Sequence, residues 1–139
     1  MPKPAEAIVD STVILNLAKT GRLDKLCKLI GTIYVPVCVR RETKLYGRRR
    51  HRPDVDRFKR KTTLCNEWSP AIFAAALATF RQQTPRCSNR GEAEMIAQAA
   101  LRRVRLVLTD DQAATRYAQL RGLEVWATPL ILVKIAAST

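Results

Sequence analysis

Carboxylates placed next to expected strands and helices are the residues of this sequence best suited to do chemistry. They are Asp10, Glu42, Glu92, Glu94, Asp110 and Asp111. Like charges that gather in one place repel, which raises their pKa values unless a cation lies between them. A hard divalent ion with oxygen ligands, Mg²⁺ or Mn²⁺, is the usual solution. Because 25 Lys and Arg outnumber 12 Asp and Glu, for a net charge of +13, a metal held by carboxylates here indicates phosphodiester chemistry.

Each carboxylate taken alone also suits a simpler role. Asp10 would cap the helix that follows it, and Glu42 would pair with Arg40 or Arg41, which precede it. Two glutamates at a helix start complement the helix dipole, and an aspartate pair after a strand again suits a cap. The combination of these acids, in this order along the chain, is what favours a site.

Length and charge bound the organisation and the partners of the chain. The length of 139 residues predicts a single domain, residues 1–139. A pI near 10.4 should attract polyanions such as RNA, DNA or an acidic protein. The densest positive charge lies in a basic insertion at about 47–63, expected to be an exposed loop or a frayed helix extension. Its candidate nucleic-acid-binding residues are Arg48, Arg49, Arg50, Arg52, Lys59, Arg60 and Lys61.

Several function classes are disfavoured by what the sequence contains. Four widely spaced cysteines and one histidine do not fit a zinc finger or ribbon, and reduced thiols are expected. No glycine-rich nucleotide-binding loop occurs, and a single His51 gives little support to a Ser-His-Asp triad. No signal peptide or apolar stretch long enough to span a membrane is found. We therefore expect a cytoplasmic protein without a membrane partner.

Apolar runs that alternate with helical patterns predict an α/β fold with a mainly parallel sheet. The expected strands are Ala5–Asp10, Thr32–Val35, Arg105–Thr109 and Leu123–Ala127. The expected helices begin near Ser11 or Thr12, Leu23, Pro36, Ser69, Gly91, Asp111 and Thr128. Ligands gather at the carboxyl ends of parallel strands. The acids that follow the first and third strands should therefore converge, although they lie far apart in the chain.

Five pieces of the sequence together carry a family resemblance. They are Ile8–Leu15, Ile33–Glu42, Gly91–Ala99, Leu106–Asp111 and Gly122–Val125. In this order they resemble the PIN domain family, the metal-dependent ribonuclease fold of VapC-type toxins, and in particular its short bacterial branch with a Gly-Glu-Ala-Glu motif. The resemblance covers about residues 5–46 and 90–137. It implies a PIN-like three-layer sandwich, with a mainly parallel central sheet flanked by helices.

The resemblance also implies roles for individual residues. Asp10 is the first catalytic metal ligand, and the hydroxyl of Thr12 orients it or a water. Glu42 is the second acid of the family pattern, and either Asp110 or Asp111 is the last.

The third acid comes from the Gly-Glu-Ala-Glu helix, where both glutamates are candidates. Residues two apart in a helix point about 200° apart, so Glu92 and Glu94 are not expected to face the same ion. Glu92 is the first choice because it is nearest the helix start and so nearest the strand ends, with Glu94 expected to swing away.

The function implied by the resemblance is that of a Mg²⁺- or Mn²⁺-dependent endoribonuclease that hydrolyses RNA phosphodiester bonds. The chain would be the toxin of a toxin–antitoxin pair, with a small antitoxin protein and a second copy of itself as further candidate partners. The alternative is a non-catalytic PIN-like module that binds RNA or an acidic protein.

Overall fold

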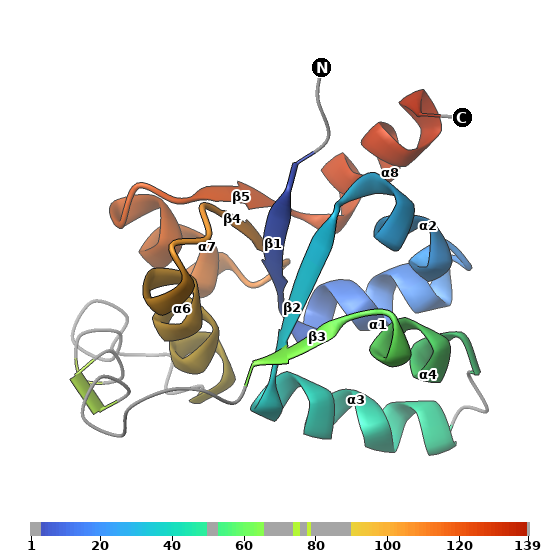
Figure 1. Cartoon of the computed structure of the whole chain (residues 1–139), viewed down its shortest axis with the longest axis horizontal. Helices are drawn as coiled ribbons and strands as arrows, with labels where there is room; N and C mark the ends of the chain where they lie inside the picture. The colour runs from blue at the N-terminus through green and yellow to red at the C-terminus, as the bar shows by residue number, and fades with distance from the viewer. Residues whose placement is uncertain (1–3, 50–52, 66–73, 76–77, 79–89, 139) are drawn as a thin grey trace.

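The computed structural model describes residues 4–49, 53–65, 74–75, 78 and 90–138, and of these it describes 45–49, 64–65 and 90–93 by their backbone. Strands and helices alternate along most of this length (Figure 1). The strands are β1 (Glu6–Val9), β2 (Thr32–Pro36), β3 (Thr63–Cys65), β4 (Leu106–Leu108) and β5 (Glu124–Trp126). The helices are α1 (Ser11–Lys19), α2 (Leu23–Leu29), α3 (Val37–Arg49), α4 (Pro53–Arg60), α6 (Arg90–Arg102), α7 (Gln112–Leu120) and α8 (Thr128–Ala137).

The described strands form one parallel sheet with β1 at its centre. The strand order is β3-β2-β1-β4-β5, and each pair of neighbours is parallel. Ile8 is level with Tyr34 on one side and with Val107 on the other. The predicted parallel α/β fold is therefore confirmed, and the four expected strands are all present. The edge strand β3 was not expected.

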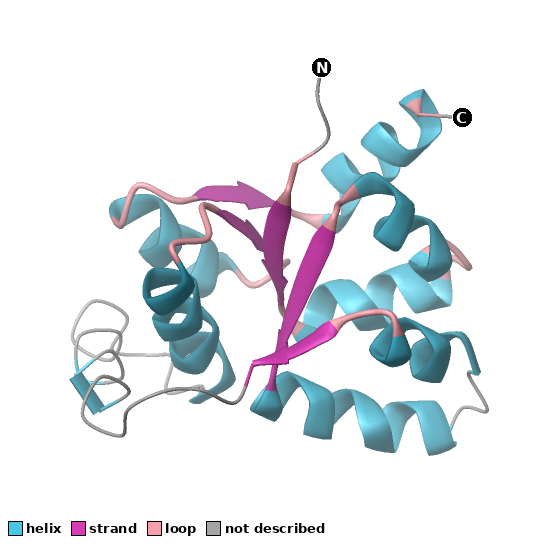
Figure 2. Cartoon of the chain, in the orientation of Figure 1, coloured by secondary structure: helices cyan, strands magenta, loops and turns pink. Residues whose placement is uncertain are grey.

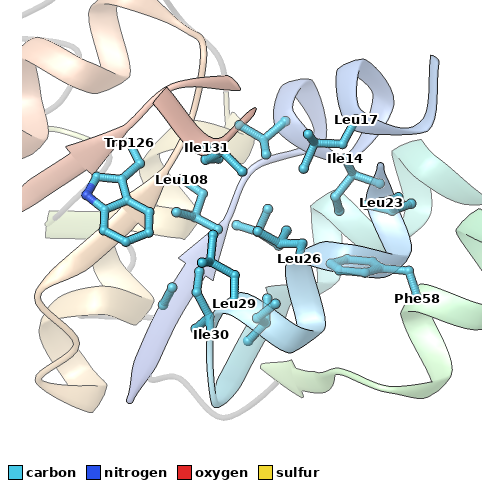
Figure 3. Close-up of a cluster of buried hydrophobic side chains, with 14 of the residues drawn as sticks. Ile14, Leu17, Leu23, Leu26, Leu29, Ile30, Phe58, Leu108, Trp126 and Ile131 are labelled. Carbon is cyan, nitrogen blue, oxygen red and sulfur yellow. The ribbon is translucent and has the colours of Figure 1, made fainter. Parts of the chain in front are cut away.

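Helices cover both faces of the sheet and make the three layers (Figure 2). Side chains alternate along β1, so that Ala7 and Val9 enter one core while Ile8 enters the other. The first core packs the sheet against α1, α2, α4 and α8, and Figure 3 shows its large side chains. The second packs it against α6 and α7. Strands buried on both faces are typical of such sheets, and the predicted three-layer sandwich is confirmed.

The basic insertion differs from the prediction. It was expected to be an exposed loop or a frayed helix extension, but residues 53–60 form α4, whose Val55 and Phe58 are fully buried. Two apolar residues three positions apart give a short helix one buried face, and the surrounding charges conceal this spacing. First-turn acids and last-turn bases complement the dipole of α4.

Other expectations fall partly outside the described chain. Of the alanine-rich helix expected over 69–82, only Ala74, Ala75 and Ala78 are described, and they are helical. Across the described part of the chain, no helix is long and apolar enough to cross a membrane. Neither Cys27 nor Cys38 forms a disulfide.

Because α4 packs on the first core through Phe58, we expect Phe58→Ala to destabilise the fold by about 3–5 kcal/mol. Urea unfolding should show this decrease. The control is Arg60→Ala on the exposed side of the same helix, which should stay within about 0.5 kcal/mol of the unsubstituted protein. Equal midpoints for the two variants would mean that α4 does not pack on the core in solution.

Candidate functional site

The site lies at the carboxyl edge of the sheet, where β1 and β4 end next to each other. The amide of Asp10 donates to the carbonyl of Leu108 at 2.8 Å, which continues the pairing of the two strands by one step. Thr109 and Asp110 follow β4 at once. Parallel pairing thus brings together two chain segments that the sequence separates, as predicted.

Asp10 is a buried carboxylate with only 3% of its surface exposed. Its Oδ1 accepts a hydrogen bond from the Ser11 amide at 2.7 Å. Its Oδ2 accepts from the hydroxyls of Thr12 at 3.0 Å and Thr109 at 2.9 Å. Burial raises the pKa of the Asp10 carboxyl, and these hydrogen bonds oppose the rise. The negative charge of Glu42 raises that pKa further.

Thr12 and Thr109 orient Asp10 through the same pattern of hydrogen bonds. The Thr12 hydroxyl accepts from the amide of Asp110, and the Thr109 hydroxyl accepts from the amide of Asp111, both at 3.1 Å. Because a backbone amide donates to the oxygen of each threonine hydroxyl, the proton of that hydroxyl is free to point at Asp10. Thr12 was predicted to orient the first acid, and its geometry fits that role. Thr109 does the same from the other strand end.

Glu42 is joined to Asp10 through Ser11. The Ser11 hydroxyl donates to Glu42 Oε2 at 2.5 Å and lies 3.4 Å from Asp10 Oδ1. Glu42 itself is exposed on α3. The alternative role, an ion pair with the flanking arginines, does not occur among the described side chains. Glu42 therefore faces the Asp10 site.

Asp110 ties the end of β4 to two helices. Its Oδ2 accepts from the Asn16 amide group of α1 at 2.7 Å and from the Thr128 hydroxyl. Its Oδ1 accepts from the Thr128 amide at the start of α8, at 2.6 Å. Three donors therefore occupy most of the acceptor capacity of this carboxylate.

Asp111 is less fully engaged. It is the N-cap of α7, and its Oδ1 accepts from the Ala114 amide at 2.7 Å. Its Oδ2 has no hydrogen-bond partner in the part of the chain that is described. Asp111 thus combines the predicted capping role with one oxygen that remains available to a ligand.

On α6 the orientation of Glu94 differs from the expectation. Glu94 was expected to swing away from the strand ends, but it is 1% exposed and accepts a hydrogen bond from the Cys38 thiol, two residues beyond β2. The face of α6 that packs on β1, β2 and α3 points Glu94 inward. The side chain of Glu92 lies outside the described residues.

Lys59 is the most unusual of the predicted nucleic-acid-binding residues. It was expected in an exposed loop, but it is only 6% exposed, because its apolar stem packs with the buried side of α4. Burial lowers the pKa of its ammonium, Asp56 opposes this, and the positive charges of Arg40 and Lys44 on α3 lower it further. Its ammonium has no ion-pair partner among the described residues. Lys59 therefore places a cationic group near Arg40 and Lys44 without an ion pair in the described part of the chain.

The other candidates in the basic insertion are mostly undescribed. Arg60 and Lys61 are exposed. The side chains of Arg48, Arg49, Arg50 and Arg52 lie outside the described residues. Their role in binding nucleic acid stays a prediction.

The donors present at the site bear on metal binding. In the described part of the chain, no three His, Cys, Asp or Glu side chains are grouped closely enough to hold one ion. Mg²⁺, however, is usually bound by one or two carboxylates together with water and phosphate oxygens rather than by a full protein cage. Asp10 and Glu42, linked by Ser11, meet that smaller requirement with oxygen donors.

Several polar residues of the site were not predicted as such. They are Ser11, Asn16, Cys38, Thr109 and Thr128. Ser11 and Thr109 adjoin the predicted acids at strand ends, and this position is a signal that the sequence does contain. The contacts of the other three depend on how helices pack, and no local pattern reveals them.

Comparisons with known proteins agree with this architecture. A family model described as "DUF3368: PIN domain" matches residues 6–139. The crystal structure of PAE2754 from Pyrobaculum aerophilum is similar with a TM-score of 0.69 and 14% sequence identity, over 96% of this chain and 96% of that chain. At this identity the likeness shows the fold. No curated protein sequence matches.

The raised pKa of Asp10 predicts how stability depends on pH without metal. A raised folded-state pKa gives stability that is full below the ordinary value of 3.8 and is lost as pH rises through the raised value. Asp10→Asn has no carboxyl to ionise at this position, so it does not lose this stability. Measured in chelator, the melting temperature of the variant minus that of the unsubstituted protein should therefore increase from pH 4 to pH 7. Asp24→Asn, which removes a surface carboxylate of α2, gives the baseline. A gain no larger than this baseline would show that burial does not perturb Asp10.

Proposed function

The chain belongs to the PIN domain family, and from this membership and the Asp10 site we propose that it is a Mg²⁺- or Mn²⁺-dependent endoribonuclease. The observation that carries the proposal is the burial of Asp10 beside the negative charge of Glu42. A carboxylate so placed favours a cation, which relieves both the burial and the repulsion.

The residues of the site suit such an ion. Asp10 Oδ1 accepts one strong hydrogen bond and Glu42 Oε2 accepts another, so each carboxylate keeps acceptor capacity. When bound, a divalent ion would lower the pKa of its water and stabilise negative charge on a phosphate. Thr12, Thr109 and Ser11 would hold the two carboxylates in position.

For the last acid of the family pattern we propose Asp111 rather than Asp110. Asp111 has a free oxygen, whereas three donors hold Asp110 in place. Asp110 then acts as a structural clip between β4, α1 and α8. Glu94 and Glu92 stay candidates for the acid that α6 supplies.

The proposed substrate is RNA bound by its backbone. Arg40 and Lys44 lie on α3, the helix that also carries Glu42, and they approach Lys59 of α4. Cations along one helix beside a carboxylate site suit a phosphate chain, and they give affinity without reading sequence. We place the activity in a cytoplasmic toxin whose partners are an antitoxin and a second copy of the chain.

The central experiment is cleavage of labelled RNA with Mg²⁺, Mn²⁺ or chelator. We expect metal-dependent cleavage that Asp10→Asn and Asp111→Asn reduce by orders of magnitude. Asn is as good a helix N-cap as Asp, so Asp111→Asn should keep its melting temperature. Asp110→Asn should instead destabilise the fold by about 1–3 kcal/mol, because its amide would face the Asn16 donor, and should retain cleavage where it is folded.

The outcomes separate the alternatives. Loss of cleavage in Asp110→Asn with full cleavage in Asp111→Asn would reverse the two roles. Absence of cleavage by the unsubstituted protein with either metal, with RNA binding intact, would favour the non-catalytic module.

RNA affinity should depend on Lys44 and Lys59. In the double variant Lys44→Met, Lys59→Met we expect weaker binding to single strands, and a log–log salt slope lower by about 0.7 for each phosphate that the protein no longer neutralises. Methionine keeps most of the apolar stem that Lys59 buries. The control Lys25→Met, Lys28→Met removes two exposed charges of α2, the helix that leads into the amino end of β2 (Figure 1). Equal slopes in the two double variants would refute this contact surface.

A further inference from the structure

Among the helices that the structure describes, α1, α6 and α7 end in the same backbone motif. The residue with positive φ is Gly21 after α1 and Gly122 after α7, but it is Arg103, with a φ of 57°, after α6. In each case its amide donates to the carbonyl three positions earlier, and the next amide donates to the carbonyl five positions earlier. Glycine takes this left-handed conformation freely, whereas a residue with a Cβ is strained there. Such an outlier points to a role for the side chain of Arg103.

Arg103 lies at the amino edge of the sheet, where the connections from α6 to β4 and from α7 to β5 run side by side (both are loops in Figure 2). The amide of Glu124, at the start of β5, donates to the carbonyl of Arg105 at 2.8 Å. Arg105 immediately precedes β4, and Arg121 is the C-cap of α7. All three arginines are exposed. The two connections therefore gather them at the edge opposite to the Asp10 site.

The charges of these arginines are not neutralised by neighbouring acids. Arg103, Arg105 and Arg121 form no ion pair in the part of the chain that is described. The carboxylates of Glu6 and Glu124, at the starts of β1 and β5, accept instead from the side chains of a tyrosine and a tryptophan, both at 3.0 Å. Since the guanidinium groups keep their charge unpaired, this edge favours an anion that contacts several of them at once.

The chemistry of the side chains favours phosphate as that anion. Arginine presents a planar fork of donors that fits two phosphate oxygens, which lysine does not. Arg121 is also held in place, because it donates to the Tyr117 hydroxyl at 2.8 Å and lies over that ring at 4.9 Å from its centroid. A group that is already positioned loses less freedom when a ligand binds.

We propose that Arg103, Arg105 and Arg121 form a second RNA-binding surface, at the edge of the sheet opposite to the Asp10 site. The central strand β1 is four residues long, which is about 13 Å at the rise of a parallel strand, so one RNA strand can contact both edges. This surface holds the RNA backbone away from the site where cleavage is proposed. The inference rests on RNA as the proposed ligand, but not on cleavage.

Arg103→Gly is the decisive variant, because it should change stability and binding in opposite directions. Glycine relieves the left-handed strain, so the melting temperature should rise by about 2–5 °C. The affinity for labelled single-stranded RNA, measured by fluorescence anisotropy in chelator, should fall severalfold because a phosphate contact is lost. A rise in melting temperature with unchanged affinity would mean that Arg103 only caps α6, and would overturn its place in the surface.

A double variant tests the surface as a whole. Arg103→Gly, Arg105→Gln should lower the log–log slope of RNA binding against salt by about 1.4, which is about 0.7 for each of two phosphates. The matched control Lys25→Gln, Lys28→Gln removes the same charge from α2, which packs on the other face of the sheet, and should change the slope much less.

Equal slopes in the two double variants would overturn the proposal. Leu101 and Leu120, which are 43% and 65% exposed at the ends of α6 and α7, would then indicate that an acidic protein contacts this edge instead. Both measurements are made in chelator and neither involves cleavage. Failure of this inference would therefore leave the proposed nuclease activity untouched, and loss of cleavage in Asp10→Asn would not bear on the second surface.

Discussion

Burial of the Asp10 carboxylate is the constraint on which the rest of the site depends. A charge that is 3% exposed needs donors on several sides, since an unpaired buried charge is very costly. The donors come from two strand ends, Thr12 after β1 and Thr109 after β4. Only parallel pairing at the same level brings those ends together. The register of the central strands therefore decides which donors reach Asp10, and these donors in turn act on the pKa of its carboxyl.

The same strand end also fixes the helices around the site. Asp110 accepts from Asn16 of α1 and from Thr128 at the start of α8, and Asp111 caps α7. Consecutive residues of one turn thus orient helices on both faces of the sheet. A ligand at the carboxyl edge of the sheet would meet polar side chains that are already held in place. Fewer side chains would then have to be ordered on binding, which lowers its entropic cost.

The sequence was enough to predict the central strands and the convergence of their acids. Continuous apolar runs indicate strands buried on both faces, and the carboxyl-end rule for parallel sheets then places Asp10 near Asp110. It was not enough for α4, because Val55 and Phe58 lie within a run of charges, or for β3. Nor was it enough for Glu94, which was expected to point away from the strand ends. Helix geometry says that Glu92 and Glu94 point apart, but only the packing of α6 shows that Glu94 is buried.

The balance of charge along α3 explains how a carboxylate site can serve a polyanion. A net charge of +13 would attract a polyanion such as the proposed RNA substrate at long range, but at physiological salt this attraction is screened beyond about 8 Å. Near the site, Asp10 and Glu42 repel phosphate. Cations must therefore lie close to the acids without pairing with them. One helix achieves this, because Glu42 faces Ser11 while Arg40 and Lys44 approach Lys59. The acids would thus stay available to the proposed metal, and the bases to the backbone of the proposed RNA substrate.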